Sequence, residues 1–287
     1  MATYIIRKLL YSILVLIGVI TVTFSLMYVI PGDPARLMLG QRADIASIDA
    51  VRKQLGLDDP LYVQYGRFMV KAVQGDLGRS YSSNRDVLTT IIETFPATAI
   101  LAVSALILSS IIGIMIGVIS SVRPYTFADN FSMLVALFGI SFPPFALGLI
   151  MALVFGAWLK WFPISGYINN GMIYLVLPML TLALRPLAII ARLTRSSMLD
   201  VLGQDYVRTA RAKGVNEWKV IIKHALRNAL NPVITTISAW LAALLGGTFF
   251  IEYIFNWPGI GLLAINSILS LDFPMIQGTV LFTAVIF

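Results

Sequence analysis

Long uncharged, apolar runs alternate with short charged segments along the sequence. A helix that crosses a lipid bilayer needs about 20 mostly apolar residues. The runs that approach or exceed this length, and the start of one more, are Leu9–Gly32, Thr94–Val122, Asn130–Leu159, Met172 to about Arg192, Asn228–Ile251 and Phe273–Phe287. The pattern predicts an all-α polytopic membrane protein with six spans. Two adjacent prolines, Pro143 and Pro144, are expected to break the third span early.

The sixth run is too short to cross a membrane, and it reaches Phe287 without a charged residue. We therefore expect the sixth span to be truncated here and the natural protein to continue past Phe287. The alternative is a half-span that packs against neighbouring helices.

The composition supports a membrane protein. The 287 residues are 58% hydrophobic and 12% charged, whereas soluble domains carry roughly 25% charged residues. A soluble enzyme, a disordered protein and a fibre are excluded. The sequence has no cysteine and one histidine, His224, which excludes disulfides, thiol catalysis and a multi-histidine metal site. It also lacks the glycine-rich phosphate loop of ATPases, so we expect that this chain does not hydrolyse ATP itself. We expect no catalytic residue, cofactor or metal in this chain.

The net charge of +7 arises from where the basic residues lie. Lys and Arg precede the first run, as Arg7 and Lys8, separate the second from the third, as Arg123, and fill the segment between the fourth and fifth. Cytoplasmic loops carry such an excess of Lys and Arg. These segments, and with them the N-terminus, are therefore predicted to be cytoplasmic. The charge reflects membrane orientation, and no nucleic-acid partner is expected.

A long polar segment, residues 33–96, follows the first span on the external side. Short helices are expected to begin at Ser47 and at Pro60, and a third is expected over 85–92, before Pro96 opens the second span. This segment either packs as a cap over the span ends or docks an extracellular partner.

The segment between the fourth and fifth spans, 193–228, is too polar to cross a membrane. Its pattern predicts a helix with an apolar side, a break at Gly214, and a second, basic amphipathic helix capped by Asn216. Such a helix either fits a groove on a partner protein or lies on anionic lipid.

Residues 205–214 of this segment read DYVRTARAKG, and residues 223–229 read KHALRNA. Further motifs occur in order along the chain: PGDP at 31–34, QLGLD at 54–58, GDLG at 75–78, ARLTR at 191–195 and FNWPG at 255–259. Together they resemble the ABC importer permease subunits of the dipeptide/oligopeptide (peptide/nickel) transport family. Arg208-Thr209-Ala210 replaces the Glu-Ala-Ala of the broader superfamily, and Arg227 replaces a later proline. Both departures are typical of the peptide and nickel branch.

The resemblance implies a type I ABC importer permease that forms half of a translocation pathway. The partners it implies are a second permease, two ATPase subunits that hold ATP and Mg, an extracytoplasmic substrate-binding protein and membrane lipid, in a prokaryotic cytoplasmic (inner) membrane. The implied substrates are di- and oligopeptides, with glutathione or nickel as alternatives. The residues implied to contact the ATPase are Arg208, Ala210, Gly214, Asn216, Glu217, Lys219 and His224.

The resemblance also divides the chain by function. Residues 1–32 form the N-terminus and first span, 33–96 the external segment, and 97–287 the permease core with its coupling loop at 193–228. A secondary transporter or channel is the rival interpretation, but such proteins usually place acidic residues within their spans. An intramembrane enzyme is a further rival, and it lacks the residues that catalysis would need.

Charged and small residues within the runs have two interpretations each. Arg185 either faces the translocation pathway or extends toward the cytoplasm, because an Arg in hydrocarbon must find water or a partner. Glu252 and Asp272 are expected at span ends, where charge is ordinary. The small residues around Gly113 and Gly117 pack helices within the chain or against a partner permease.

Overall fold

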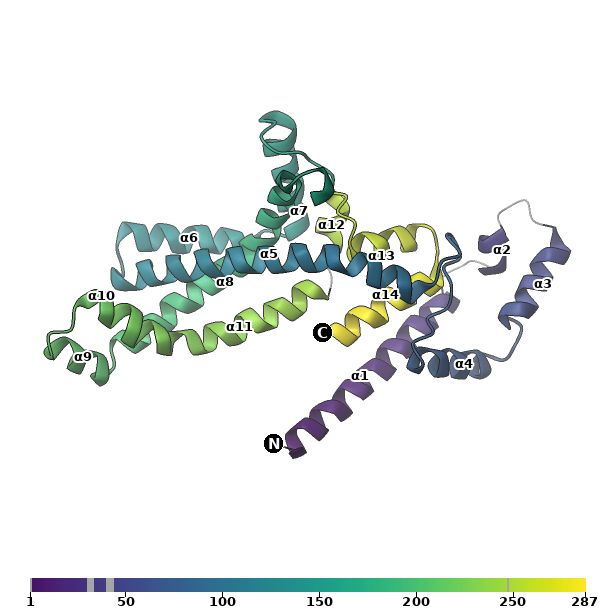
Figure 1. Cartoon of the computed structure of the whole chain (residues 1–287), viewed down its shortest axis with the longest axis horizontal. Helices are drawn as coiled ribbons and strands as arrows, with labels where there is room; N and C mark the ends of the chain where they lie inside the picture. The colour runs from purple at the N-terminus through teal and green to yellow at the C-terminus, as the bar shows by residue number, and fades with distance from the viewer. Residues whose placement is uncertain (1, 30–33, 40–43, 247) are drawn as a thin grey trace. The chain divides into compact units, whose positions relative to one another are not determined.

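The computed structural model describes residues 2–29, 34–39, 44–246 and 248–287, and its regular elements within these residues are helices (Figure 1). By length and composition, α1 (Ala2–Val29), α5 (Val87–Val122), α8 (Val176–Leu202) with the turn before it, and α11 (Arg227–Leu245) with the helical turns before it could each cross a membrane. The predicted all-helical membrane fold is confirmed.

The remaining helices are shorter. They are α2 (Pro34–Leu39), α3 (Ile45–Leu55), α4 (Leu61–Val73), α6 (Phe127–Ser141), α7 (Pro144–Met151), α9 (Asp205–Ala212), α10 (Glu217–Lys219), α12 (Phe249–Ile254), α13 (Ile260–Leu269) and α14 (Phe273–Ile286). Residues Ala152–Trp158 and Val220–Leu226 form π-helical turns, and Ile168–Asn170 and Met172–Leu175 form 3₁₀ turns.

The predicted break of the third span is present. Helix α6 ends at Ser141, α7 begins at Pro144, and the two segments are bent by 104°. Counted as one bent span, this pair brings the candidate spans to five among the described residues. Helix α14 is shorter than a span, so the sixth span stays a prediction. The PGDP motif falls largely on 30–33, outside the described residues.

Two predicted boundaries were wrong. The expected short helix at 85–92 is the beginning of α5, which continues through Pro96. Asp86 explains the early start, because its carboxylate accepts a hydrogen bond from the Thr89 amide at 2.8 Å and caps the helix before the proline. Similarly, Asp44 rather than Ser47 caps α3, whereas Gly56 ends that helix as expected, with φ of 65°.

The chain folds into two compact units, residues 1–97 with 258–287, and residues 98–257; each is described separately. In the first unit, apolar side chains of α1, α5, α13, α14 and the loop between α4 and α5 bury one another; the buried set is Ile20, Leu77, Val87, Ile91, Ile260, Met275 and Leu281. Helix α4 joins this unit by packing on α1, where the Tyr65 and Thr21 hydroxyls lie 2.8 Å apart.

In the second unit, α6 and α11 pack against α8, and α5 lies beside α8 (Figure 1). The approach of α5 to α8 depends on two glycines. A Cβ at Gly113 would lie 2.9 Å from the Leu187 carbonyl oxygen, and one at Gly117 would lie 2.6 Å from the Ala191 carbonyl oxygen. The small residues of α5 therefore serve packing within the chain.

Candidate coupling surface and translocation helices

A helical hairpin forms where α8 ends. Helix α8 runs ten residues past the predicted end of the fourth span, to Leu202, and α9 follows after a two-residue turn. Val207 and Ala210 of α9 and Val220 beyond α10 are buried together, with Val201, Leu202 and Val215 around them. The hairpin is thus held by a small apolar core of its own.

The predicted turn between the two helices is confirmed. Gly214 has a φ of 74°, a conformation that glycine adopts without strain. Asn216 then caps the second helix, because its side-chain oxygen accepts a hydrogen bond from the Trp218 amide at 2.9 Å. From Glu217 the chain remains helical to Leu245, which joins the turn to α11 without a break.

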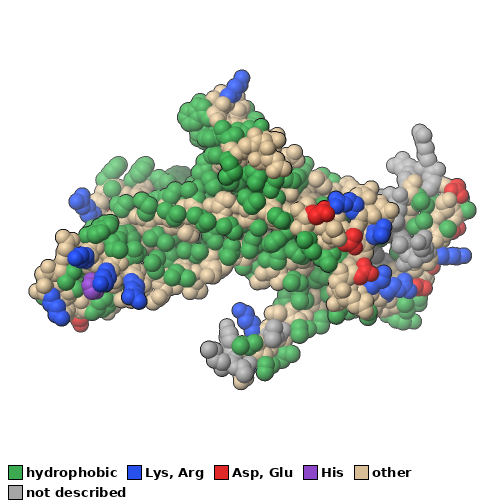
Figure 2. Space-filling model, viewed as in Figure 1, with side chains coloured by type: hydrophobic (Ala, Val, Ile, Leu, Met, Phe, Trp, Pro, Cys, Tyr) green, Lys and Arg blue, Asp and Glu red, His purple; other side chains and the backbone are tan. Residues whose placement is uncertain are grey.

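The sequence-predicted coupling residues occupy different positions in this hairpin. Arg208, Gly214, Asn216, Glu217 and Lys219 are exposed, and His224 is half-buried. Ala210 is 8% exposed and packs in the core, so it joins the helices and offers little surface. Lys and Arg side chains gather over α9 and α10 (Figure 2).

An ion pair closes the hairpin across Gly214. Glu217 accepts hydrogen bonds from the Arg211 guanidinium at 2.7 and 3.1 Å. These bonds raise the pKa of Arg211 above its usual value. The pair is half-exposed, so it orients the turn more than it stabilises the fold.

Sequence reasoning missed the most exposed aromatic residue of the hairpin. The Trp218 side chain is 68% exposed, and Tyr206 and Ile222 are also exposed. We define the candidate coupling surface, called the coupling surface below, as Tyr206, Arg208, Gly214, Asn216, Trp218, Lys219 and Ile222. The signal was available, because tryptophan and arginine are enriched among the residues that dominate protein interfaces, and Trp218 and Ile222 are four residues apart on one helix face.

Arg185 is exposed on α8, and its guanidinium lies 6.0 Å from the centre of the Trp240 ring on α11. No described acidic residue forms an ion pair with it. Arg192, Ser196 and Asp200 are exposed at helical spacing from Arg185, which gives α8 a polar stripe along one side.

Helix α11 carries a similar stripe. Asn231, Thr235 and Ser238 are exposed at spacings of four and three residues. Polar residues in membrane helices usually face a water-filled cavity or other protein rather than lipid. Both stripes therefore mark the faces of α8 and α11 that could line a pathway.

Sequence reasoning also missed two buried carboxylates in this unit. Asp129 at the start of α6 is 1% exposed and accepts hydrogen bonds from Arg195 of α8 at 2.6 and 2.7 Å. Glu252 in α12 is fully buried and accepts from the Thr98 and Thr248 hydroxyls at 2.9 and 2.7 Å.

The expectation that Glu252 and Asp272 are ordinary span-end charges was wrong, since Asp272 is also buried, with 2% exposure. Within the described residues, no group of three or more His, Asp or Glu side chains is placed to hold a metal ion.

Comparison with known proteins assigns the family. Residues 109–287 match the family described as the binding-protein-dependent transport system inner membrane component, and residues 1–102 match the corresponding N-terminal family. The chain belongs to this family. It is an ABC importer permease subunit, as the resemblance in its motifs predicted, and a multi-pass protein of the inner membrane.

Individual relatives match nearly the whole length of this permease. It is 44% identical over 281 residues to the glutathione transport system permease protein GsiC of Escherichia coli O6:H1, covering 98% of this chain and 91% of that protein. The proteins of the same name from Escherichia coli K12 and Shigella flexneri serotype 5b are each 43% identical over the same shares.

Proposed function

We propose that this permease forms half of the translocation pathway of an ATP-driven importer of small peptides, with glutathione as the first candidate substrate. The similarity to the glutathione permeases over 98% of the chain carries this proposal. Glutathione is a tripeptide with two carboxylates, so it also falls within the broader class of di- and oligopeptides. Nickel is the remaining alternative from the sequence, and no described residue favours it.

The proposed mechanism is alternating access driven from the cytoplasm. Two ATPase subunits bind the coupling surfaces of this permease and of a second permease, and an external binding protein delivers the substrate. Closure of the ATPases pushes on α9 and α10. The continuous helix from Glu217 to Leu245 transmits that push to α11, and the core around Val207 transmits it to α8. This subunit supplies a pathway and a lever, while ATP is hydrolysed by its partners.

The substrate assignment is tested by reconstituting the importer with its partners in liposomes. Uptake of labelled glutathione should require ATP and the binding protein. Competition by unlabelled glutathione, dipeptides and nickel ions then ranks the substrate classes. Uptake of nickel or of longer peptides without uptake of glutathione would contradict the proposal.

The coupling role is tested at Trp218. Trp218→Ala should lower transport-coupled ATP turnover by about thirtyfold, because an exposed aromatic anchor at an interface is worth about 2 kcal/mol. Its thermal unfolding in detergent should match the wild type, since little of the side chain is buried. Phe127→Ala, at an even more exposed aromatic residue of α6, is the control and should leave turnover unchanged.

Crosslinking gives a direct readout of the same surface. The chain has no cysteine, so Asn216→Cys and Lys219→Cys each provide a single reactive thiol. Both should crosslink to an ATPase subunit. Reaction with lipid alone would favour the surface-helix interpretation, in which the hairpin lies on the membrane.

The pathway role is tested at Arg185. Arg185→Ala should impair import while the complex still assembles, and Arg185→Lys should impair it less because the charge is kept. A cysteine at this position should react with a water-soluble thiol reagent in at least one nucleotide state, whereas one at Ile107, an exposed apolar residue of α5, should not. Normal import by Arg185→Ala, together with an unreactive cysteine in every state, would place Arg185 outside the pathway.

A further inference from the structure

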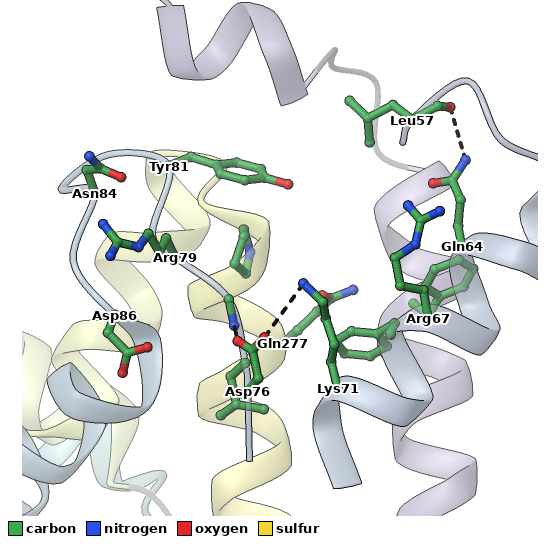
Figure 3. Close-up of a pocket in the computed structure, with 15 residues that line it drawn as sticks. Leu57, Gln64, Arg67, Lys71, Asp76, Arg79, Tyr81, Asn84, Asp86 and Gln277 are labelled. Carbon is green, nitrogen blue, oxygen red and sulfur yellow. Dashed lines mark hydrogen bonds and ion pairs between the residues drawn. The ribbon is translucent and has the colours of Figure 1, made fainter. Parts of the chain in front are cut away.

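A cavity of about 530 Å³ lies within the first unit, between α4 and the loop that follows this helix. Figure 3 shows Arg79, Tyr81 and Asn84 of the loop on one side and Gln64, Arg67 and Lys71 of α4 on the other, with Gln277 of α14 between them. Phe24 of α1 and Phe68 of α4 add an apolar surface. This volume is within the range of pockets that bind small molecules.

The charges around the cavity are of both signs. The Arg67 guanidinium contacts Asp59 at 2.5 Å, and the Lys71 ammonium lies 3.6 Å from Asp76. Arg79 is exposed, and no described carboxylate lies within ion-pair distance of it. Asp76 and Asp86 also line the cavity. The lining thus offers a cation for a ligand carboxylate and carboxylates for a ligand ammonium.

Asp272 holds in place the loop between α4 and α5, which carries Arg79. This buried carboxylate accepts hydrogen bonds from the Ser80 hydroxyl at 2.5 Å, the Tyr81 amide at 3.0 Å and the Ser82 hydroxyl at 2.9 Å. A backbone bridge pairs Arg79 with Asp86. Because these bonds hold the backbone on both sides of Arg79, the cavity is largely formed before any ligand binds.

The opposite wall is fixed as well. The Gln64 side-chain amide donates hydrogen bonds to the Leu57 and Asp59 carbonyl oxygens at 3.0 and 2.7 Å. These bonds tie α4 to the turn that follows α3. Both walls therefore keep their polar groups in place.

We propose that this cavity is a receiving site for the small peptide on the external side, in which Arg79 binds a peptide carboxylate and Asp76 and Asp86 face its ammonium group. The proposal rests on the proposed peptide-importing function and deepens it. A carboxylate side chain of the binding protein offers the same chemistry, but a concave site of this volume, lined from two sides, favours a free tripeptide over a flat protein surface.

The first test compares Arg79→Gln with Arg85→Gln in the complete importer in liposomes. Arg85 belongs to the same loop but pairs with Glu93 at 2.5 Å and does not line the cavity. Arg79→Gln should lower uptake of labelled glutathione about tenfold, the effect of losing one charge-assisted hydrogen bond. Binding-protein-stimulated ATP turnover should persist, and Arg85→Gln should behave as the wild type. Equal uptake by both variants would overturn the proposal.

The second test identifies what occupies the cavity. A photoreactive phenylalanine analogue in place of Tyr81 should capture labelled glutathione. Unlabelled glutathione should prevent the capture, and glutathione amidated at both carboxylates should not. Capture of the binding protein alone, or competition by the diamide, would overturn the proposal. If the wild-type importer does not take up glutathione at all, the proposed substrate itself is wrong, which is a separate outcome.

Discussion

Asp129 and Asp272 are both buried carboxylates near helix starts, but their partners differ. Asp129 joins two membrane helices through a bidentate ion pair with Arg195. Asp272 joins α14 to the loop between α4 and α5 through neutral hydroxyl and amide donors. A buried charge is tolerated only when it is paired or well hydrogen-bonded, and the kind of partner determines what its removal costs.

This difference fits the role proposed for each region. The helices α6 and α8 must move as one body if they transmit a push from the coupling surface, and a bidentate ion pair fixes their relative orientation. If the loop between α4 and α5 binds a peptide, it must hold its side chains in fixed positions, which several directional hydrogen bonds achieve. We therefore expect a substitution at Asp129 to destabilise the whole helix bundle and a substitution at Asp272 to affect only the loop that it holds.

The largest effect is expected for Asp129→Ala. It would leave the Arg195 guanidinium, whose side chain is 20% exposed, without its partner. Breaking a buried pair in this way costs about 3–5 kcal/mol, so thermal unfolding in detergent should begin at a clearly lower temperature. Arg192→Ala, which removes an exposed cation of the same helix, is the control.

The double variant Asp129→Ala with Arg195→Met sharpens this test. It removes both charges, so much of the lost stability should return. If Asp129→Ala unfolds at the wild-type temperature, the ion pair does not hold α6 to α8.

A smaller, local effect is expected for Asp272→Asn. The side-chain amide has one acceptor oxygen where the carboxylate has two, so at least one of the donors at Ser80, Tyr81 and Ser82 loses its partner. An unsatisfied buried group costs about 1–3 kcal/mol. Hydrogen exchange should rise in residues 79–86 and remain unchanged in α6 and α8. Asp49→Asn, at an exposed carboxylate of α3, is the control; a bundle-wide rise in exchange would remove the proposed contrast.

These two carboxylates also show what sequence reasoning could not reach. The apolar runs predicted the spans, and Pro60, Gly214 and Asn216 predicted helix boundaries, because those signals lie within a few residues of their effect. The partners of Asp272 are about 190 positions away in sequence, and Asp129 and Arg195 are 66 apart. The periodic pattern of apolar and polar residues carries no information about contacts between residues so far apart in sequence. Both aspartates stand at the edges of apolar runs, where an exposed charge is the ordinary expectation.

At the candidate coupling surface, too, the sequence predicts some features, whereas others depend on how the helices pack. The position of the hairpin formed by α9 and α10 follows from its polar sequence, its glycine and its cap, all of which are local. The burial of Ala210 and the exposure of Trp218 depend on how α9 packs against the turn after α10. Helical spacing alone does not show which apolar side chains are covered within the chain, so it could not separate the buried Ala210 from the exposed Trp218.

The smallest effect is expected at Asp86, where the carboxylate is exposed and caps α5 instead of being buried. The hydrogen bond from the Thr89 amide lowers the pKa of Asp86, so the ionised form stabilises the folded state. That contribution is fully present above the unfolded pKa of about 3.9 and is lost as the pH falls through the lower, folded pKa.

Asp86→Ala should cost about 1 kcal/mol of stability at neutral pH, the usual value of a helix cap. Asp86→Asn should cost less, because asparagine caps nearly as well, and its stability relative to the wild type should improve on acidification below about pH 4. Thermal unfolding of the three proteins between neutral pH and about pH 3 measures both effects; an unchanged difference between wild type and Asp86→Asn across that range would show that the charge of Asp86, unlike the charge of Asp129, contributes nothing to the fold.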